Sequence, residues 1–374
     1  MHQLVKEFVD QREEMINLLQ KLVELESPSI DKEATDKLSS FLANYLQQLG
    51  CQVEILEQEN YGNHVLATFG EEGPPLLVLC HMDTVWATGE IKERPFRVEG
   101  NKAYGPGVMD MKGGIVQALF ALAAAKKRGL KRQIKILLNT EEEIGSPSSR
   151  PIIEEQALKA KAVLVLEPPV GTHGALKTFR KGVGMFNIKV KGKAAHAGAD
   201  PEKGVSAVEE LARQIIKLHS LTDLEQGTTV NVGVIGGGTR SNVIAAEAWA
   251  GVDLRVPSMA EVERVMPIIQ NLKPELTGTE VVVEGELNRP PMERTPAIVQ
   301  LFQHAQRLGE EMGFNLEEIG TGGASDGNFT AALGVPTLDG LGAVGEGGHA
   351  HHEYIILDYL PERAALLTRL FETL

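Results

Sequence analysis

The sequence predicts an α/β protein with a layered main domain and a smaller α+β domain inserted into it. Two observations predict this fold. Apolar runs of strand length alternate with amphipathic segments of helix length towards both ends of the chain, which is the order of βαβ units. The middle of the chain has a different order of elements, and it could fold as a compact unit of its own.

The first part of the chain predicts helices followed by strands. Apolar residues between positions 4 and 22 recur at mostly helical spacing, and Ser27-Pro28-Ser29 ends that pattern. Residues 33–49 predict a second amphipathic helix. Residues 52–57 alternate like a strand, and residues 75–80 form a continuous apolar run. Such a run is typical of a strand that is buried on both faces, in a sheet covered by helices.

The same pattern continues on both sides of the middle segment. Residues 113–127 predict a helix, followed by strand-like residues 133–138 and a buried strand at 160–166. This succession indicates a layered domain with a largely parallel sheet. Beyond the middle segment, helices are predicted at 296–312 and from Pro361 onward, with a loop and a further helix between them.

The middle segment predicts a ferredoxin-like α+β sandwich with the element order β-α-β-β-α-β. Its strands and helices are expected, in chain order, at 185–190, 204–219, 228–235, 245–254, 259–272 and 279–284. The first domain is thereby split into two sequence segments. We place the main domain at residues 1–181 and 289–374, and the inserted domain at 182–288.

Composition excludes several classes of protein. The 374 residues contain 37 basic and 51 acidic side chains, a net charge of −14, whereas nucleic-acid binding needs a basic face. The most continuous apolar stretch, 114–125, is short and contains Gln117, and a membrane span needs about 20 apolar residues. The charged start of the chain carries no visible secretory signal, and two cysteines are too few for a disulfide framework. We expect a cytoplasmic protein.

Polar side chains follow the predicted strands of the main domain. His81 and Asp83 end one apolar run and, being two residues apart, point to the same side of a strand. Asp110 lies in the glycine-rich loop GPGVMDMKGG, Glu141-Glu142-Glu143 follow a second strand, and Glu167 follows a third. The carboxyl ends of the strands are where open α/β sheets bind ligands.

A histidine cluster in GEGGHAHHEY, comprising His349, His351 and His352, is a further candidate. Carboxylates with imidazoles match zinc, or cobalt or manganese, rather than a thiolate site. The set exceeds the needs of one catalytic metal, so two metals bridged by a carboxylate would use it well. A lone His-x-Asp pair is often only hydrogen-bonded, and a run of three glutamates is usually a solvated helix start. Their coincidence at strand ends favours a metal site.

These residues resemble those of the dinuclear zinc exopeptidase and deacylase family, which includes glutamate carboxypeptidase, acetylornithine deacetylase, succinyl-diaminopimelate desuccinylase and the tripeptidase. The matching motifs, in family order, are LLVLCHMDTV, YGPGVMDMKGG, NTEEEIGS, VLEP, GKAAHAG, NVIAAEAWAGVDLR, GGASDGN and GHAHHE. The resemblance implies a three-layer α/β/α catalytic domain with an inserted lid and dimerisation domain. It also implies two Zn²⁺ ions per chain, with Co²⁺ or Mn²⁺ as alternatives.

The resemblance implies a role for each strand-end residue. By position, His81 and Glu167 match ligands of one zinc, and Asp83 matches the carboxylate that orients the His81 ring. Asp110 matches the carboxylate that bridges the two ions. Glu143 matches a ligand of the other zinc.

In the same way, Glu142 matches the general base. Glu141 stands where the family commonly has aspartate, and we assign it no catalytic role. His349 matches the last metal ligand because Glu353 follows it by four residues, as in the family; His351 and His352 fit less well.

The inserted domain carries motifs of its own. His196 resembles the family histidine that reaches the partner subunit's active site and stabilises the oxyanion, which implies a homodimer. Asn242 and Arg255 resemble substrate-binding residues, and the two-pronged donors of an arginine suit a carboxylate. Segment 322–326 resembles an active-site loop. A hinge is expected near Lys181 and Asn288.

Order and spacing are most similar to glutamate carboxypeptidase, but residues 168–181 lack that enzyme's lysine for the glutamate side chain, for which Lys177 or Arg180 could substitute. We therefore expect a metal-dependent hydrolase that removes a C-terminal amino acid from small peptides or N-acyl amino acids with a free carboxylate. The alternatives are an N-acyl-amino-acid deacylase and a non-catalytic metal-binding protein, against which the presence of Glu142 argues. No nucleic-acid or membrane partner is expected.

Overall fold

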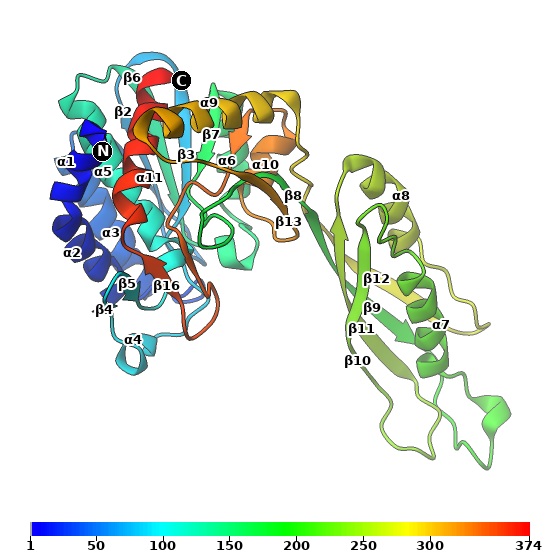
Figure 1. Cartoon of the computed structure of the whole chain (residues 1–374). Helices are drawn as coiled ribbons and strands as arrows, with labels where there is room; N and C mark the ends of the chain where they lie inside the picture. Colours follow the sequence, from blue (N-terminus) through cyan, green and yellow to red (C-terminus); the bar gives the residue numbers. More distant parts are fainter. Residues whose placement is uncertain (1) are drawn as a thin grey trace. The chain divides into compact units, whose positions relative to one another are not determined.

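The computed structural model describes residues 2–374, and these divide into two compact units (Figure 1). The first unit comprises the chain up to Phe179 together with Arg294–Gly320 and Ser325–Leu374. The second unit comprises Arg180–Glu293 and the short segment Thr321–Ala324. The borders predicted from the sequence lie after residues 181 and 288 instead, and Thr321–Ala324 is not predicted to separate from its neighbours.

The main sheet of the first unit has the strand order β1-β2-β6-β3-β7-β14. These strands are β1 (Gln52–Leu56), β2 (His64–Phe69), β3 (Glu72–His81), β6 (Arg132–Asn139), β7 (Ala162–Val165) and β14 (Thr337–Leu338). Strands β6, β3, β7 and β14 run parallel, while β1 and β2 are antiparallel to their neighbours. In β3 the run Leu76–Cys80 is buried, as expected for a strand covered on both faces.

Helices cover both faces of this sheet. Leu76 and Val78 of β3 belong to a core shared with α1 (Gln3–Asp10), α2 (Arg12–Glu24), α3 (Lys32–Gln48), α5 (Gly113–Lys127), α9 (Pro296–Met312) and α11 (Tyr359–Thr373). Leu77 and Leu79, which point the other way, pack with α6 (Arg150–Leu158) and α10 (Gly327–Ala332). The predicted three-layer α/β/α arrangement is confirmed. The stretch Val108–Lys127 has the length and apolar composition of a membrane span, but it is mostly buried in this core.

Smaller strands complete the first unit. A sheet with the order β15-β16-β5-β4 joins β15 (Gly345–Glu346) and β16 (Tyr354–Ile356) to β5 (Lys102–Tyr104) and β4 (Arg97–Glu99). The turn between β15 and β16 carries the histidine cluster. The helix α4 (Glu90–Glu93) precedes this sheet in the chain, and β8 (Leu176–Arg180) pairs with β13 (Glu318–Thr321).

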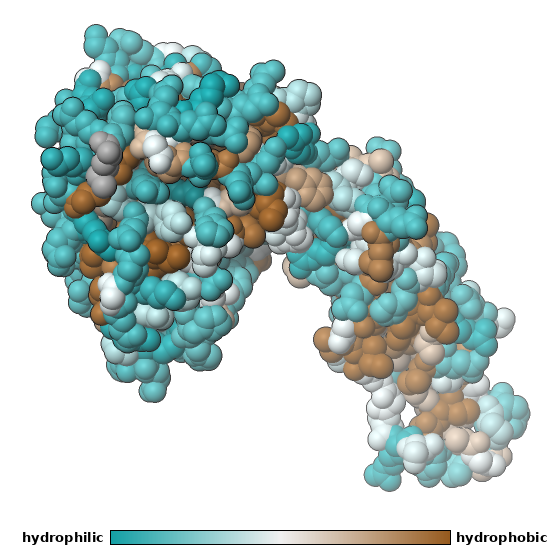
Figure 2. All heavy atoms as spheres, in the orientation of Figure 1, coloured by the Kyte–Doolittle hydropathy of each residue, from teal (hydrophilic) through white to brown (hydrophobic). Residues whose placement is uncertain are grey.

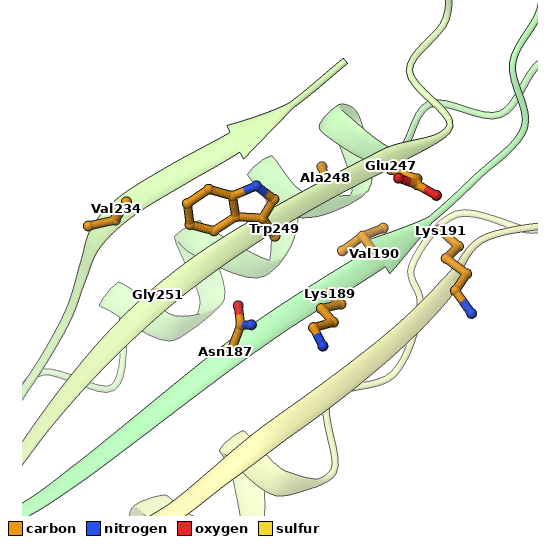
Figure 3. A pocket seen from close by; sticks show the side chains of 9 residues that line it. All are labelled: Asn187, Lys189, Val190, Lys191, Val234, Glu247, Ala248, Trp249 and Gly251. Atoms are coloured by element: carbon orange, nitrogen blue, oxygen red, sulfur yellow. The ribbon is translucent and has the colours of Figure 1, made fainter. Parts of the chain in front are cut away.

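The second unit has the predicted order β-α-β-β-α-β. Its elements are β9 (Gly182–Lys191), α7 (Ala207–His219), β10 (Thr229–Gly237), β11 (Glu247–Val256), α8 (Met259–Gln270) and β12 (Glu280–Arg289), and the antiparallel sheet has the order β10-β11-β9-β12. Both helices pack on one face of this sheet. The other face holds a cavity of about 800 Å³ lined by Trp249, Lys189 and neighbouring residues (Figure 3), none of which is a predicted site residue.

Candidate metal centre

The strand-end residues of the main sheet lie at one edge. Leu79 of β3 pairs with Leu137 of β6 and with Val165 of β7, so these three parallel strands reach their carboxyl ends together. His81 is the last residue of β3, Glu142 and Glu143 follow β6, and Glu167 follows β7. This register brings the predicted site residues of three separate segments to the same edge.

The loop that carries Asp110 is held by a buried carboxylate. Glu353 accepts hydrogen bonds from the backbone N–H groups of Gly107 (2.9 Å), Met109 (2.9 Å) and Asp110 (3.1 Å). Burial raises the pKa of Glu353 despite these donors. In the sequence analysis Glu353 marks only the register of His349, so its role in fixing the Asp110 loop is new. Glu353 is 243 residues from Asp110 in the sequence, so no local sequence pattern indicates that it holds the Asp110 loop.

Close packing brings this loop against the end of β7. A Cβ atom on Gly114, at the start of α5, would lie 2.4 Å from the backbone oxygen of Leu166. Only glycine allows this approach without a shift of the backbone. The glycines after Asp110 therefore seat the helix directly beside the strand end that leads to Glu167.

Asp110 lies between two histidines. Its Oδ1 atom is 2.9 Å from Nε2 of His81, and its Oδ2 atom is 3.4 Å from Nε2 of His349. Nε2 of His81 is also 3.5 Å from Oε1 of Glu167, and Nε2 of His349 is 3.0 Å from Oε2 of Glu143. Each oxygen of Asp110 thus faces its own histidine, and each histidine contacts a further carboxylate, an arrangement suited to a bridging ligand.

Among the described residues, two overlapping groups have ligand atoms within 4.8 Å of one another. One group is His81, Glu142 and Glu167, and the other is His81, Asp110 and Glu143. Their imidazole nitrogens and carboxylate oxygens are the donors that zinc, cobalt and manganese accept. His351 instead has its Nδ1 atom 3.5 Å from Oε1 of Glu90, a residue that belongs to neither group.

The charges at this site fit a cation. Burial, and then the charge of Asp110, raise the pKa of Glu143 to about 7. Hydrogen bonds to Asp110 and Glu143 raise the pKa of His349 to about 11, and contacts with carboxylates raise that of His81 against the effect of burial. In the metal-free chain the histidines therefore hold protons that offset the carboxylates. Metal binding replaces such protons, so the residues present fit a metal centre.

Asp83 connects the strand end of His81 to the loop of Glu142. Its carboxylate accepts a hydrogen bond from the Ser29 hydroxyl (2.7 Å) and from the backbone N–H groups of Glu142 and Glu143 (3.2 Å each). Nδ1 of His81 lies 3.0 Å from the backbone oxygen of Asp83 and 3.5 Å from its Oδ1. Asp83 is thus placed to orient the imidazole from the side opposite Asp110.

A buried polar network supports the loop from behind. The carboxylate of Glu141 accepts hydrogen bonds from the N–H group (2.8 Å) and hydroxyl (3.1 Å) of Ser148, and from Ser149. Nε2 of His64 lies 3.0 Å from Oγ of Ser148, and burial lowers the pKa of His64 to about 4. Glu141 therefore faces the protein interior, whereas Glu142 and Glu143 lie beside the predicted metal ligands.

The remaining predicted site residues belong to the second unit. His196 and Asn242 lie on adjacent segments, joined by a hydrogen bond from Ala197 N–H to the backbone oxygen of Asn242 (2.9 Å). Arg255 binds the carboxylate of Asp253 and donates through Nη1 to the backbone oxygen of Gly322 (3.3 Å).

The two residues that could substitute for the missing lysine, Lys177 and Arg180, both lie on β8. Lys177 is a buried residue of β8, and Arg180 donates to the backbone oxygen of Gly323 (3.2 Å).

The family model described as "Peptidase family M20/M25/M40" matches residues 77–373. The chain belongs to this family. It is therefore a metal-dependent hydrolase of the peptidase and deacylase type, and the resemblance inferred from the motifs is confirmed. The family includes both activities, so membership leaves the substrate undefined.

Individual relatives extend over most of the M20 chain. It is 32% identical to carboxypeptidase G2 of Pseudomonas sp. (strain RS-16) over 373 residues, covering 96% of this chain and 89% of the relative. It is 30% identical to acetylornithine deacetylase of Klebsiella pneumoniae (strain 342) over 269 residues, 65% of this chain and 68% of the relative. The solved structure of a Staphylococcus aureus tripeptidase has the same fold, with a TM-score of 0.81, 24% identity and coverage of 96% and 98%.

We predict that His349→Ala lowers the amount of metal bound per chain, because it removes one of the two imidazoles that face Asp110. Elemental analysis of the purified protein measures this directly. His351→Ala, in the same turn but beside Glu90, is the matched control and should keep the full metal content. A reversed result would move the ligand to His351.

We also predict that His64 makes the protein less stable in acid. Its pKa is about 4 when folded and near the ordinary 6.5 when unfolded, so the unfolded chain binds more protons between these values. Stability should be complete above pH 6.5 and fall as the pH drops towards 4. Between pH 7 and pH 5 the loss from this residue is about 2 kcal/mol. Denaturant unfolding of His64→Gln should lack this part of the pH dependence, and an unchanged dependence would contradict the assignment.

Proposed function

We propose that the protein is a dinuclear zinc exopeptidase that removes the C-terminal amino acid from small peptides or N-acyl amino acids. The observation that carries the proposal is the position of Glu142. This carboxylate stands on the same short turn as Glu143, and its ligand atom lies within 4.8 Å of those of His81 and Glu167. A carboxylate beside a metal centre is suited to act as a general base on water.

The residues that would hold the ions are those that meet around Asp110. His81 and Glu167 would bind one ion, His349 and Glu143 the other, and Asp110 would bridge them. When bound, two such ions polarise the scissile carbonyl and lower the pKa of the attacking water.

The chain's own residues supply the proton transfers. In the proposed reaction, Glu142 takes a proton from the attacking water and passes it to the leaving amine. Asp83 keeps the turn of Glu142 in place by accepting hydrogen bonds from two of its backbone N–H groups. Because this turn is fixed before substrate arrives, the base needs no rearrangement to reach the water.

His196 is proposed to stabilise the oxyanion. Its Nδ1 atom accepts hydrogen bonds from the backbone N–H groups of Gly198 (3.2 Å) and Ala199 (3.0 Å). Since Nδ1 is an acceptor, the ring proton lies on Nε2, and this N–H group can donate a hydrogen bond to a developing oxyanion. Arg255 and Asn242 are proposed to bind the substrate carboxylate.

A homodimer is part of the proposal, since His196 is expected to act in the partner's site. The second unit offers an apolar surface for it: β10 is an edge strand, and Val234, Ile235 and Ile216 of β10 and α7 are exposed. Hydrophobic residues of this unit gather on the visible surface (Figure 2). Exposed edges with apolar side chains favour association with another chain.

The similarity to carboxypeptidase G2 favours a peptidase, whereas the similarity to acetylornithine deacetylase favours a deacylase with the same chemistry. A substrate panel decides between them. It contains dipeptides with C-terminal glutamate, other dipeptides, and N-acetyl and N-succinyl amino acids, each assayed for released amino acid with and without a chelator. Cleavage of peptides would support the exopeptidase, and cleavage of acyl amino acids alone would support the deacylase.

We predict that Glu142→Gln lowers kcat by roughly 10² to 10⁴-fold, the usual contribution of a general base, without loss of bound metal. The control is Glu155→Gln, a change of the same kind at an exposed ion pair on α6. Turnover and metal content are measured on the same preparations. Full turnover by Glu142→Gln would contradict the mechanism, and metal without turnover in the unchanged protein would favour the binding-protein alternative.

A further inference from the structure

The first unit contains an apolar cavity of about 320 Å³ whose wall includes the predicted metal ligand Glu143. It is lined by Pro28, Ser29, Ile30, Thr84, Val85, Trp86, Ala87, Glu143 and Ile144. We propose that this cavity binds the group on the acyl side of the scissile amide, and that this group is an uncharged aliphatic chain or aromatic ring. The inference rests on the proposed exopeptidase function and adds the substrate class.

The cavity is built onto the strand ends that carry the site. The backbone N–H of Thr84 donates to the oxygen of Ser27 (2.8 Å), and the N–H of Ser29 donates to the oxygen of Thr84 (3.4 Å). The Ser29 hydroxyl donates to Asp83 (2.7 Å), which in turn accepts from the backbone of Glu143. One hydrogen-bonded group of segments therefore forms both the cavity wall and the support of the metal ligands.

Large apolar side chains are left exposed around this cavity. Ile30 is 85% exposed, Val85 45% and Ile144 42%, and they come from three different segments. Single exposed hydrophobic residues are ordinary, but a concave group of them beside a metal centre is typical of a ligand site. Contact with an apolar ligand would remove this surface from water.

Trp86 gives the cavity a rigid aromatic wall. The guanidinium of Arg94 lies 3.8 Å from the centre of its ring, and its Nε1 donates to Oε2 of Glu353 (3.2 Å). Glu353 is the residue that also fixes the Asp110 loop. The position of the indole is thereby coupled to that of the predicted bridging ligand.

The charge of the lining decides which part of a substrate fits. Among the described residues that line it, none is Lys, Arg or His, and Glu143 is an acid. A free carboxylate would therefore meet no positive side chain in the lining, and Arg94, which lies over the Trp86 ring, is already paired with Glu90. The proposed carboxylate-binding residues, Arg255 and Asn242, belong to the second unit. The cavity is thus assigned to the acyl group rather than to the amino acid that carries the free carboxylate.

The kinetic test uses one amino acid acylated with acetyl, butanoyl, hexanoyl, phenylacetyl and succinyl groups. We expect kcat/KM to rise about three- to fivefold for each added methylene, the usual gain from burying one, and the anionic succinyl group to react less well than butanoyl. Ile30→Ser should flatten the series, whereas Leu158→Ser, at an exposed leucine outside the cavity, should not. A flat series in the unchanged protein, or a preference for succinyl, would overturn the proposal.

A second test measures binding to the cavity directly and does not require turnover. The chain has two tryptophans, so Trp249→Phe leaves Trp86 as the only indole. Hexanamide should then change the fluorescence saturably, with binding at least about fivefold weaker in the additional variant Ile144→Asn. No saturable change would overturn the cavity as an apolar site. Binding of hexanamide without hydrolysis of any substrate would instead overturn the proposed function, and with it the acyl-side assignment.

Discussion

Carboxylates crowd together at the ends of β3, β6 and β7, and their mutual repulsion explains why the site needs a cation. Asp110, Glu143 and Glu167 converge there, and their side chains are only 18%, 7% and 10% exposed, so water screens their charges poorly. Burial, and then the charge of Asp110, raise the pKa of Glu143, and hydrogen bonds to Asp110 and Glu143 raise the pKa of His349. A divalent cation relieves the repulsion better than protons on histidine, because it neutralises several carboxylates and is coordinated by their oxygens.

Two carboxylates outside the proposed ligand set hold this arrangement in place. Asp83 accepts hydrogen bonds from backbone N–H groups of the turn that carries Glu142. Glu353 accepts hydrogen bonds from those of the loop that carries Asp110. Each thereby satisfies buried backbone donors and fixes a loop at the same time. The apolar cavity depends on the same two residues, through Ser29 and Trp86. Substrate recognition and metal binding thus share one framework.

Much of this could be predicted from local patterns. The α/β order, the bounds of α5 and α9, and the strand-end residues follow from runs of apolar residues and what comes after them. The sheet β15-β16-β5-β4 could not be predicted, because its strands of two or three residues have no period and pair across long sequence separations. The roles of Glu353 and Trp86 were missed for the same reason. Glu353 is 243 residues from Asp110 and 267 from Trp86, so only the folded chain brings these partners together.

Calorimetric titration of the metal-free protein with Zn²⁺, repeated in buffers of different ionisation enthalpy, measures both the number of ions bound and the protons released. We expect two equivalents to bind per chain and protons to be released near neutral pH, because the ions displace those held by His81 and His349. Binding without proton release, or fewer than two equivalents, would contradict a centre in which Asp110 joins two histidine-bearing metal sites.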